Sequence, residues 1–265
     1  MDAEHFFRAG WVRFPYDPAV ADWAARARPV AHACLADPEH RARWLRCDGT
    51  WFSGVKVFPN DASGAVPDAE VPPLAGAPVR FIADALGLAG FAWDEGQVSA
   101  CFPGYPRPSP GESSAAFRFR RDRDGAHVDG LRRFDGRRRR LGEAHGFVLG
   151  VPLTDAPAEA APLVIWEGSH EIVRRALRAR LAGVPPERWA DEDLTETYVA
   201  ARRECFERCR RVPVHALPGE SYLIHRLALH GVAPWAAGPE GERVIVYFRP
   251  DPFPGAARSW WLERR

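Results

Sequence analysis

The residues most suggestive of chemistry are a histidine and a carboxylate two positions apart, His127 and Asp129. The run before them, residues 117–120 (Phe-Arg-Phe-Arg), alternates apolar and charged side chains as a half-buried strand does. If that strand continues, both side chains project from the same face, because residues i and i+2 of a strand share a side. An imidazole and a carboxylate that point in the same direction supply two of the three protein ligands of a facial metal site.

A second histidine, His230, can supply that ligand, and it is followed by a strand-like run that begins at Arg243. Two histidines and one carboxylate form the ligand set of non-heme iron centres. An arginine at the start of a strand beside a barrel mouth can hold a carboxylate through two parallel hydrogen bonds. The pair His215 and Arg226 loosely imitates this spacing, but Arg226 falls inside an apparent strand whereas Arg243 opens one after a Gly-Pro-Glu-Gly turn.

Each of these residues also has a simpler interpretation. Asp129 could cap the turn that follows it, with His127 an ordinary polar strand residue, and Arg243 could be an exposed charge at a strand end. His225 competes with His230, although the odd offset of five residues would place the two on opposite faces of a continuous strand. The spacing alone leaves these alternatives open.

The elements that must position these residues are mostly short strands, and 25 Pro and 23 Gly favour many turns. Apolar alternation or β-branched runs predict strands over residues 51–58, 97–102, 147–153, 163–166, 212–216, 221–225 and 243–249. Helical spacing predicts a helix over 17–35 that kinks or breaks at Pro29, a helix over 79–86 that ends at Gly87, and a helical segment over 171–211 with a break at 183–186.

This pattern predicts a mainly β protein with flanking helices, built on a double-stranded β-helix (a jelly-roll, cupin-like core). Regular βα units are missing, which argues against a doubly wound sheet. We expect one domain over residues 1–265, with 1–96 as N-terminal helical and strand support and 97–250 as the jelly-roll core, interrupted by the helical insertion 171–211.

Three segments resemble the phytanoyl-CoA dioxygenase (PhyH) family of Fe(II)/2-oxoglutarate oxygenases. They are His-Val-Asp at 127–129, Gly-Val-Pro-Leu-Thr-Asp at 150–155 with Pro-Leu-Val-Ile-Trp-Glu-Gly-Ser-His at 162–170, and the stretch from Pro-Gly at 218–219 through His-Gly at 230–231 to Arg243. Together they span roughly residues 97–250. Their order and spacing are more specific than any one motif.

The resemblance implies iron on His127, Asp129 and His230, and the distal carboxylate of 2-oxoglutarate on Arg243. It implies a dioxygenase that hydroxylates a small molecule with O2 and releases succinate and CO2. Related halogenases carry a small residue in place of the carboxylate, so Asp129 favours hydroxylation. Glu167 stands where the family usually has Pro, and Gly231 follows the histidine where a Ser often helps to hold 2-oxoglutarate.

Two other classes of protein compete with an oxygenase. A catalytically silent cupin-like binding module would be expected to have a broken triad, and a cupin-type hydrolase has no evident use for Arg243. His170, in the Gly-Ser-His turn, is interpreted as structural rather than as a ligand. The arginine-rich run 132–140 could recognise an acidic substrate such as an acyl-CoA, although a solvated face is the simpler interpretation.

The composition and the first residues limit the classes of partner and the compartment that we expect. A net charge of +1 gives no support for a nucleic-acid or membrane-surface partner, and no run of roughly eighteen apolar residues predicts a membrane span. The first residues lack the basic and apolar regions of a signal peptide. The five scattered cysteines are expected to be core thiols rather than disulfides or a zinc site, so we expect a cytoplasmic protein.

Overall fold

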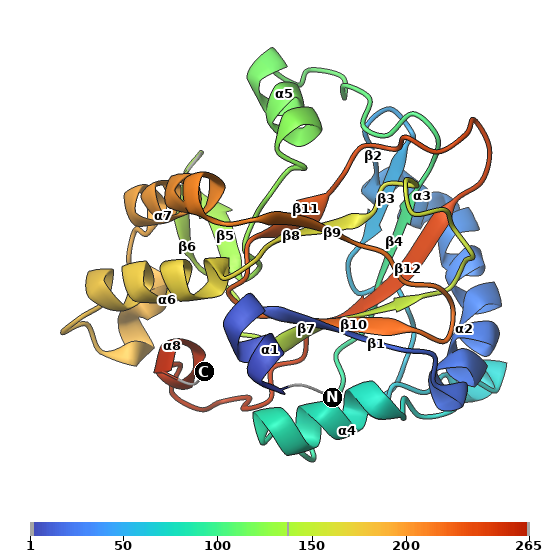
Figure 1. Ribbon diagram of the computed structural model, residues 1–265, viewed down its shortest axis with the longest axis horizontal. Helices are drawn as coiled ribbons and strands as arrows, with labels where there is room; N and C mark the ends of the chain where they lie inside the picture. The colour runs from blue at the N-terminus through green and yellow to red at the C-terminus, as the bar shows by residue number, and fades with distance from the viewer. Residues whose placement is uncertain (1–2, 137, 264–265) are drawn as a thin grey trace.

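The larger of two antiparallel sheets runs through the centre of the computed structural model, which describes residues 3–136 and 138–263 (Figure 1). Its seven strands lie in the order β1-β10-β7-β12-β4-β3-β2, and every neighbouring pair is antiparallel. Their bounds are β1 Trp11–Phe14, β10 Ser221–His225, β7 Phe147–Pro152, β12 Arg243–Phe248, β4 Gln97–Cys101, β3 Trp51–Gly54 and β2 Leu45–Arg46.

A second sheet of three antiparallel strands faces the first (Figure 1). It consists of β11 (His230–Val232), β8 (Leu163–Trp166) and β9 (Arg211–Val214). An isolated antiparallel bridge between His127 and His230 adds the segment around His127 to its edge. A separate hairpin pairs β5 (Leu131–Phe134) with β6 (Arg138–Leu141).

The two sheets pack together through one apolar cluster. It draws alternate residues from the large sheet and meets them with side chains of the small sheet: Val148, Tyr222, Ile224, Ile245 and Tyr247 against Leu163, Ile165 and Val214. Residues on the same parity of a strand share a face. Arg243 therefore lies on the inner face of β12, in the row that Ile245 and Tyr247 continue.

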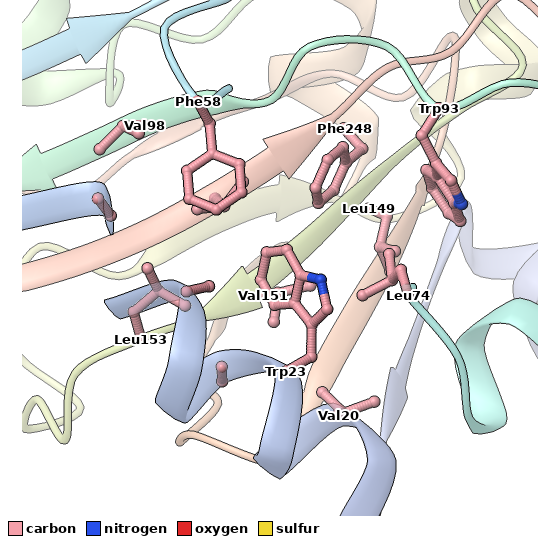
Figure 2. Close-up of a cluster of buried hydrophobic side chains, with 14 of the residues drawn as sticks. Val20, Trp23, Phe58, Leu74, Trp93, Val98, Leu149, Val151, Leu153 and Phe248 are labelled. Carbon is pink, nitrogen blue, oxygen red and sulfur yellow. The ribbon is translucent and has the colours of Figure 1, made fainter. Parts of the chain in front are cut away.

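The opposite face of the large sheet packs on helix α2 (Pro18–Ala36). Figure 2 shows Trp23 of this helix against Val151 and Leu149 of β7 and Phe248 of β12. Trp23 is fully buried, and its indole N–H donates to the carbonyl of Gly64 at 2.9 Å. A buried Trp of this size dominates the local packing energy while its N–H keeps a partner.

The outer face of the small sheet packs on the predicted helical insertion. This segment consists of α6 (Ser169–Arg180), the 3₁₀ helix η2 (Pro186–Asp191) and α7 (Thr195–Arg208). Trp166 of β8 shares a buried cluster with side chains of α6 and α7. Helices thus flank both sheets, in agreement with the predicted β protein with flanking helices.

The remaining helices are α1 Ala3–Ala9, α3 Pro38–Trp44, η1 Pro67–Ala69, α4 Ala77–Leu86, α5 Ser114–Asp122 and α8 Trp260–Glu263. Phe81 and Ile82 of α4 join the same buried cluster as α2. Gly87 ends α4 in the left-handed conformation, with φ 62°, as predicted. Of the two outcomes predicted at Pro29, the break is wrong, because α2 continues through it, and the kink stays a prediction. Ala27 and Ala31 are fully buried on either side of Pro29, so packing holds both turns despite the lost hydrogen bond.

The predicted strand through residues 117–120 is also wrong, since these residues belong to helix α5. The Ser113 side chain accepts a hydrogen bond from the Ala116 N–H at 3.3 Å and caps the helix, and Phe119 packs edge-on against Phe206 of α7. An alternation of only four residues was too short to outweigh these contacts. The strand predicted over 51–58 ends at Gly54, because Lys56 adopts a left-handed turn conformation with φ 56°.

The arginine-rich run forms the β5–β6 hairpin rather than a helix or loop, with Arg137 outside the described residues. All five cysteines are free, and four of them are buried. Across residues 3–136 and 138–263, no helix has both the length and the apolar character needed to cross a membrane. The single-domain assignment over residues 1–265 stays a prediction.

Candidate metal centre

The structure brings the three predicted ligands together at one end of the sheets. Nε2 of His127 lies 3.3 Å from Oδ1 of Asp129, and Nε2 of His230 lies 3.6 Å from Oδ2 of the same carboxylate. One potential ligand atom from each residue lies within 4.8 Å of the other two. Within the described part of the chain, this is the one group of three or more His, Cys, Asp or Glu side chains with such spacing.

Backbone pairing fixes the two histidines relative to each other. His127 and His230 exchange both backbone hydrogen bonds, at 2.8 and 3.0 Å, as a hydrogen-bonded antiparallel pair does. Nδ1 of His127 lies 3.1 Å from the Gly125 carbonyl, and Nδ1 of His230 lies 3.0 Å from the Ala228 carbonyl. Because a carbonyl only accepts, each Nδ1 carries a proton, and each Nε2 faces the Asp129 carboxylate, where it would give up any proton to bind a metal.

Gly231 is required by this pairing. A Cβ at this position would lie 2.3 Å from the backbone oxygen of Asp124, just before the His127 segment. The Val232 N–H donates to the same oxygen at 2.9 Å. Close backbone approach thus explains why this chain carries Gly where the resembling family often carries Ser.

Helix α7 contacts the segment that carries His127 and Asp129. The Tyr198 hydroxyl accepts a hydrogen bond from the Val128 N–H at 3.1 Å, directly between the two ligands. Tyr198 is 2% exposed, and the guanidinium groups of Arg139 and Arg202 lie over its ring at 5.7 and 5.4 Å from the centroid. The helical insertion therefore contacts the candidate centre through one buried phenol.

A neighbouring arginine sets the charge of the carboxylate. Burial alone would raise the pKa of Asp129, but Arg249 and hydrogen bonds from the two histidines outweigh it and hold this pKa well below its usual range. Nη1 of Arg249 lies 3.5 Å from Oδ2 of Asp129. Burial likewise opposes the charged form of His230, yet the Asp129 carboxylate raises its pKa. Asp129 is therefore ionised, as a metal ligand must be.

Arg243 opens β12 as predicted, and it is buried rather than an exposed charge at a strand end. The residue is 6% exposed, and its Nη2 contacts Sγ of Cys101 at 3.6 Å. Its Nε and Nη1 are buried without a hydrogen-bond partner in the described structure. The hydroxyls of Tyr222 and Tyr247, which lie 2.7 Å apart, belong to the same inner surface. A buried guanidinium with unsatisfied donors is costly unless an anion binds it.

The other candidates have structural partners. Nε2 of His170 is hydrogen-bonded to the Phe7 carbonyl at 2.9 Å, which agrees with its predicted structural role. Glu167, which departs from the family pattern, accepts hydrogen bonds from the side chains of Trp11 at 3.0 Å and Arg210 at 2.7 Å. The change to Glu therefore ties the turn before α6 to its neighbours.

Sequence reasoning missed Arg249, Tyr198 and His145. Arg249 follows β12 six residues after Arg243, and that even offset is the signal that could have placed both on one face. His145 is 2% exposed with neither ring nitrogen hydrogen-bonded, and burial lowers its pKa to about 4. Tyr198 carried no signal, because its contact joins segments 70 positions apart.

No protein-family model matches the chain, and no curated protein matches it. Several solved structures match the chain. EvdMO1 aligns with a TM-score of 0.50 at 14% identity over 93% of this chain and 49% of its own. The carbocyclase SnoK from nogalamycin biosynthesis, described as non-heme and alpha-ketoglutarate dependent, aligns at 0.48 and 12% identity over 94% and 81%. A 2OG-Fe(II) oxygenase family oxidoreductase from Burkholderia pseudomallei aligns at 0.48 and 14% over 97% and 91%.

At these identities the likeness concerns the fold alone. EvdMO1 shares the arrangement of sheets and helices, and this chain spans about half of its length. The chemistry must therefore be inferred from the side chains.

Proposed function

We propose that this protein is an Fe(II)/2-oxoglutarate-dependent dioxygenase that hydroxylates a small molecule and releases succinate and CO2. The observation that carries the proposal is the convergence of His127, Asp129 and His230 with both Nε2 atoms directed at one carboxylate. Two imidazoles and a hard oxygen ligand suit Fe(II), and three protein ligands leave coordination positions for other groups.

The donor set fits an iron ion by its chemistry. Both histidines are oriented by their Nδ1 contacts with backbone carbonyls so that Nε2 faces Asp129, and Asp129 is ionised. When bound, the metal would supply the means to activate O2 and oxidise a substrate C–H bond. The protein's own task is to hold the three ligands and keep Asp129 charged.

Arg243 fits the distal carboxylate of 2-oxoglutarate. Its buried Nε and Nη1 have no hydrogen-bond partner in the described structure, so each can donate to an anionic oxygen. The Tyr222 hydroxyl, on the same inner face, is the candidate for the second anchor that Gly231 cannot supply. The facing antiparallel sheets support a jelly-roll core, and the residue pattern supports a PhyH-like subgroup within the proposed class.

The intact triad and the two unpaired nitrogens of Arg243 argue against a silent cupin-like module or a hydrolase. A silent module does not need three side chains that can bind a metal, and a hydrolase does not need a buried arginine with unpaired donors for an anionic cosubstrate.

The test uses anaerobic protein loaded with Fe(II). Adding 2-oxoglutarate should produce the weak visible charge-transfer band of its chelate, and His127→Ala should abolish it. Arg243→Gln should weaken 2-oxoglutarate binding by about 2–5 kcal/mol, the scale for a buried charge left without its partner. The matched control is Arg226→Gln, since Arg226 is 5% exposed and donates to the Trp261 carbonyl. A missing band in the wild type refutes the proposal, and unchanged affinity in Arg243→Gln refutes the anchor.

A further inference from the structure

A second under-used arginine lies beside the candidate metal centre. The Arg249 side chain is 17% exposed, and its contact with Asp129 is long, at 3.5 Å from Nη1 to Oδ2. Apart from this pair, the described structure gives its guanidinium no side-chain hydrogen bond or ion pair. A group with five N–H donors is thus positioned at the metal ligands with most of its donors unused.

The other charged groups near Arg249 are already committed. Glu143 is paired with Arg132. Asp94 accepts from the backbone N–H of Arg249 at 2.7 Å, and burial raises the pKa of Asp94 to about 6 despite the nearby arginine. His145 is neutral because burial depresses its pKa. Asp129 is therefore the carboxylate that the Arg249 guanidinium contacts.

A bound metal changes the net charge around Arg249 and Asp129. A dication shares the charge of Asp129, so the metal, Asp129 and Arg249 together carry two positive charges. The chelating carboxylate of 2-oxoglutarate would neutralise one of them. One positive charge then remains beside the side chains of Arg249 and Asp129, which are 17% and 13% exposed, and uncompensated charge at such partly buried positions is costly.

We propose that Arg249 binds an anionic oxygen group of the substrate, a carboxylate or a phosphate, next to the metal. This inference rests on the proposed function and narrows its substrate class to anionic molecules. The His127 side chain is 44% exposed, so the centre is open to a substrate on that side. An arginine binds such groups through two parallel charge-assisted hydrogen bonds, which also orient the carbon to be oxidised.

The test measures binding of small anions to the anaerobic Fe(II)–2-oxoglutarate protein at saturating metal. Acetate, methylphosphonate and uncharged acetamide are titrated while the visible band is followed. We expect at least one anion to perturb the band without removing it, and acetamide to have no effect. Arg249→Gln should weaken that anion at least tenfold, whereas Arg249→Lys, which keeps the charge, should retain part of the affinity. Comparing acetate with methylphosphonate shows which anion the site prefers.

The outcomes separate the two hypotheses. A missing band in the wild type overturns the proposed function. A normal band that neither anion perturbs, or that responds equally in wild type and Arg249→Gln, overturns only the role of Arg249. Loss of the 2-oxoglutarate band in Arg249→Gln and Arg249→Lys at saturating metal also overturns it, because Arg249 would then belong to the cosubstrate site.

Discussion

Replacing Tyr198 by Phe removes one oxygen atom and tests whether the helical insertion positions the candidate metal ligands. The hydroxyl accepts the Val128 N–H at 3.1 Å, and Tyr198 is 2% exposed. Without it, a buried N–H loses its acceptor, which costs about 1–3 kcal/mol. The free segment can relax to recover a partner, whereas a bound metal pins His127 and Asp129 in place. The penalty should therefore appear mainly in the metal-bound state.

We expect Tyr198→Phe to bind a divalent metal roughly 10- to 100-fold more weakly, the range found when groups that support metal ligands are removed. Isothermal titration of metal-free protein with Co(II) or Mn(II) measures this affinity directly. The matched control is Trp189→Phe, because Trp189 lies in the same insertion, is 6% exposed and donates to the Val184 carbonyl at 2.9 Å. That variant should lose stability while keeping its metal affinity. If Tyr198→Phe lowers the melting temperature but binds metal as the wild type does, the phenol stabilises the fold only.

Two further predictions concern groups inside the protein. Burial lowers the pKa of His145 to about 4, against about 6.5 in an unfolded chain. Between these two pH values the unfolded chain binds a proton that the folded protein does not. The free energy of unfolding therefore falls as the pH drops from about 6.5 to about 4, by up to about 3 kcal/mol. In urea unfolding, the free energy of unfolding of His145→Phe should decline less from about pH 6.5 to about pH 4 than that of the wild type. An equal decline in both proteins would contradict a buried neutral imidazole at His145. A Cβ on Gly150 would lie 2.3 Å from the Tyr222 ring, so Gly150→Ala should cost roughly 1–3 kcal/mol in thermal unfolding. Gly238→Ala, which meets nothing within 4 Å, is the control, and equal stability of the two variants would place Tyr222 elsewhere.

Local pattern was a sound guide where the chain is buried on both sides. The run that became β8 is continuously apolar and bounded by turn residues, and the strand occupies the predicted residues 163–166. Strand β10 likewise occupies the predicted residues 221–225. Short amphipathic runs were a poor guide. Residues 117–120 alternate like a strand, yet the Ser113 cap and the contact with Phe206 make them helical.

The sequence by itself supplied the candidate ligands and their order, because side-chain chemistry limits which residues can bind iron. The strand period that was expected to place His127 and Asp129 on one face was wrong, since residues 117–120 are helical. The sequence also determined that Arg243 begins a strand. Only the tertiary structure decided that His127 pairs with His230, that Arg243 is buried with unsatisfied donors, and that Arg249 and Tyr198 meet the ligand segment. The physical reason is that these contacts join distant segments across two packed sheets. Their registers depend on the whole core, and no local period encodes them.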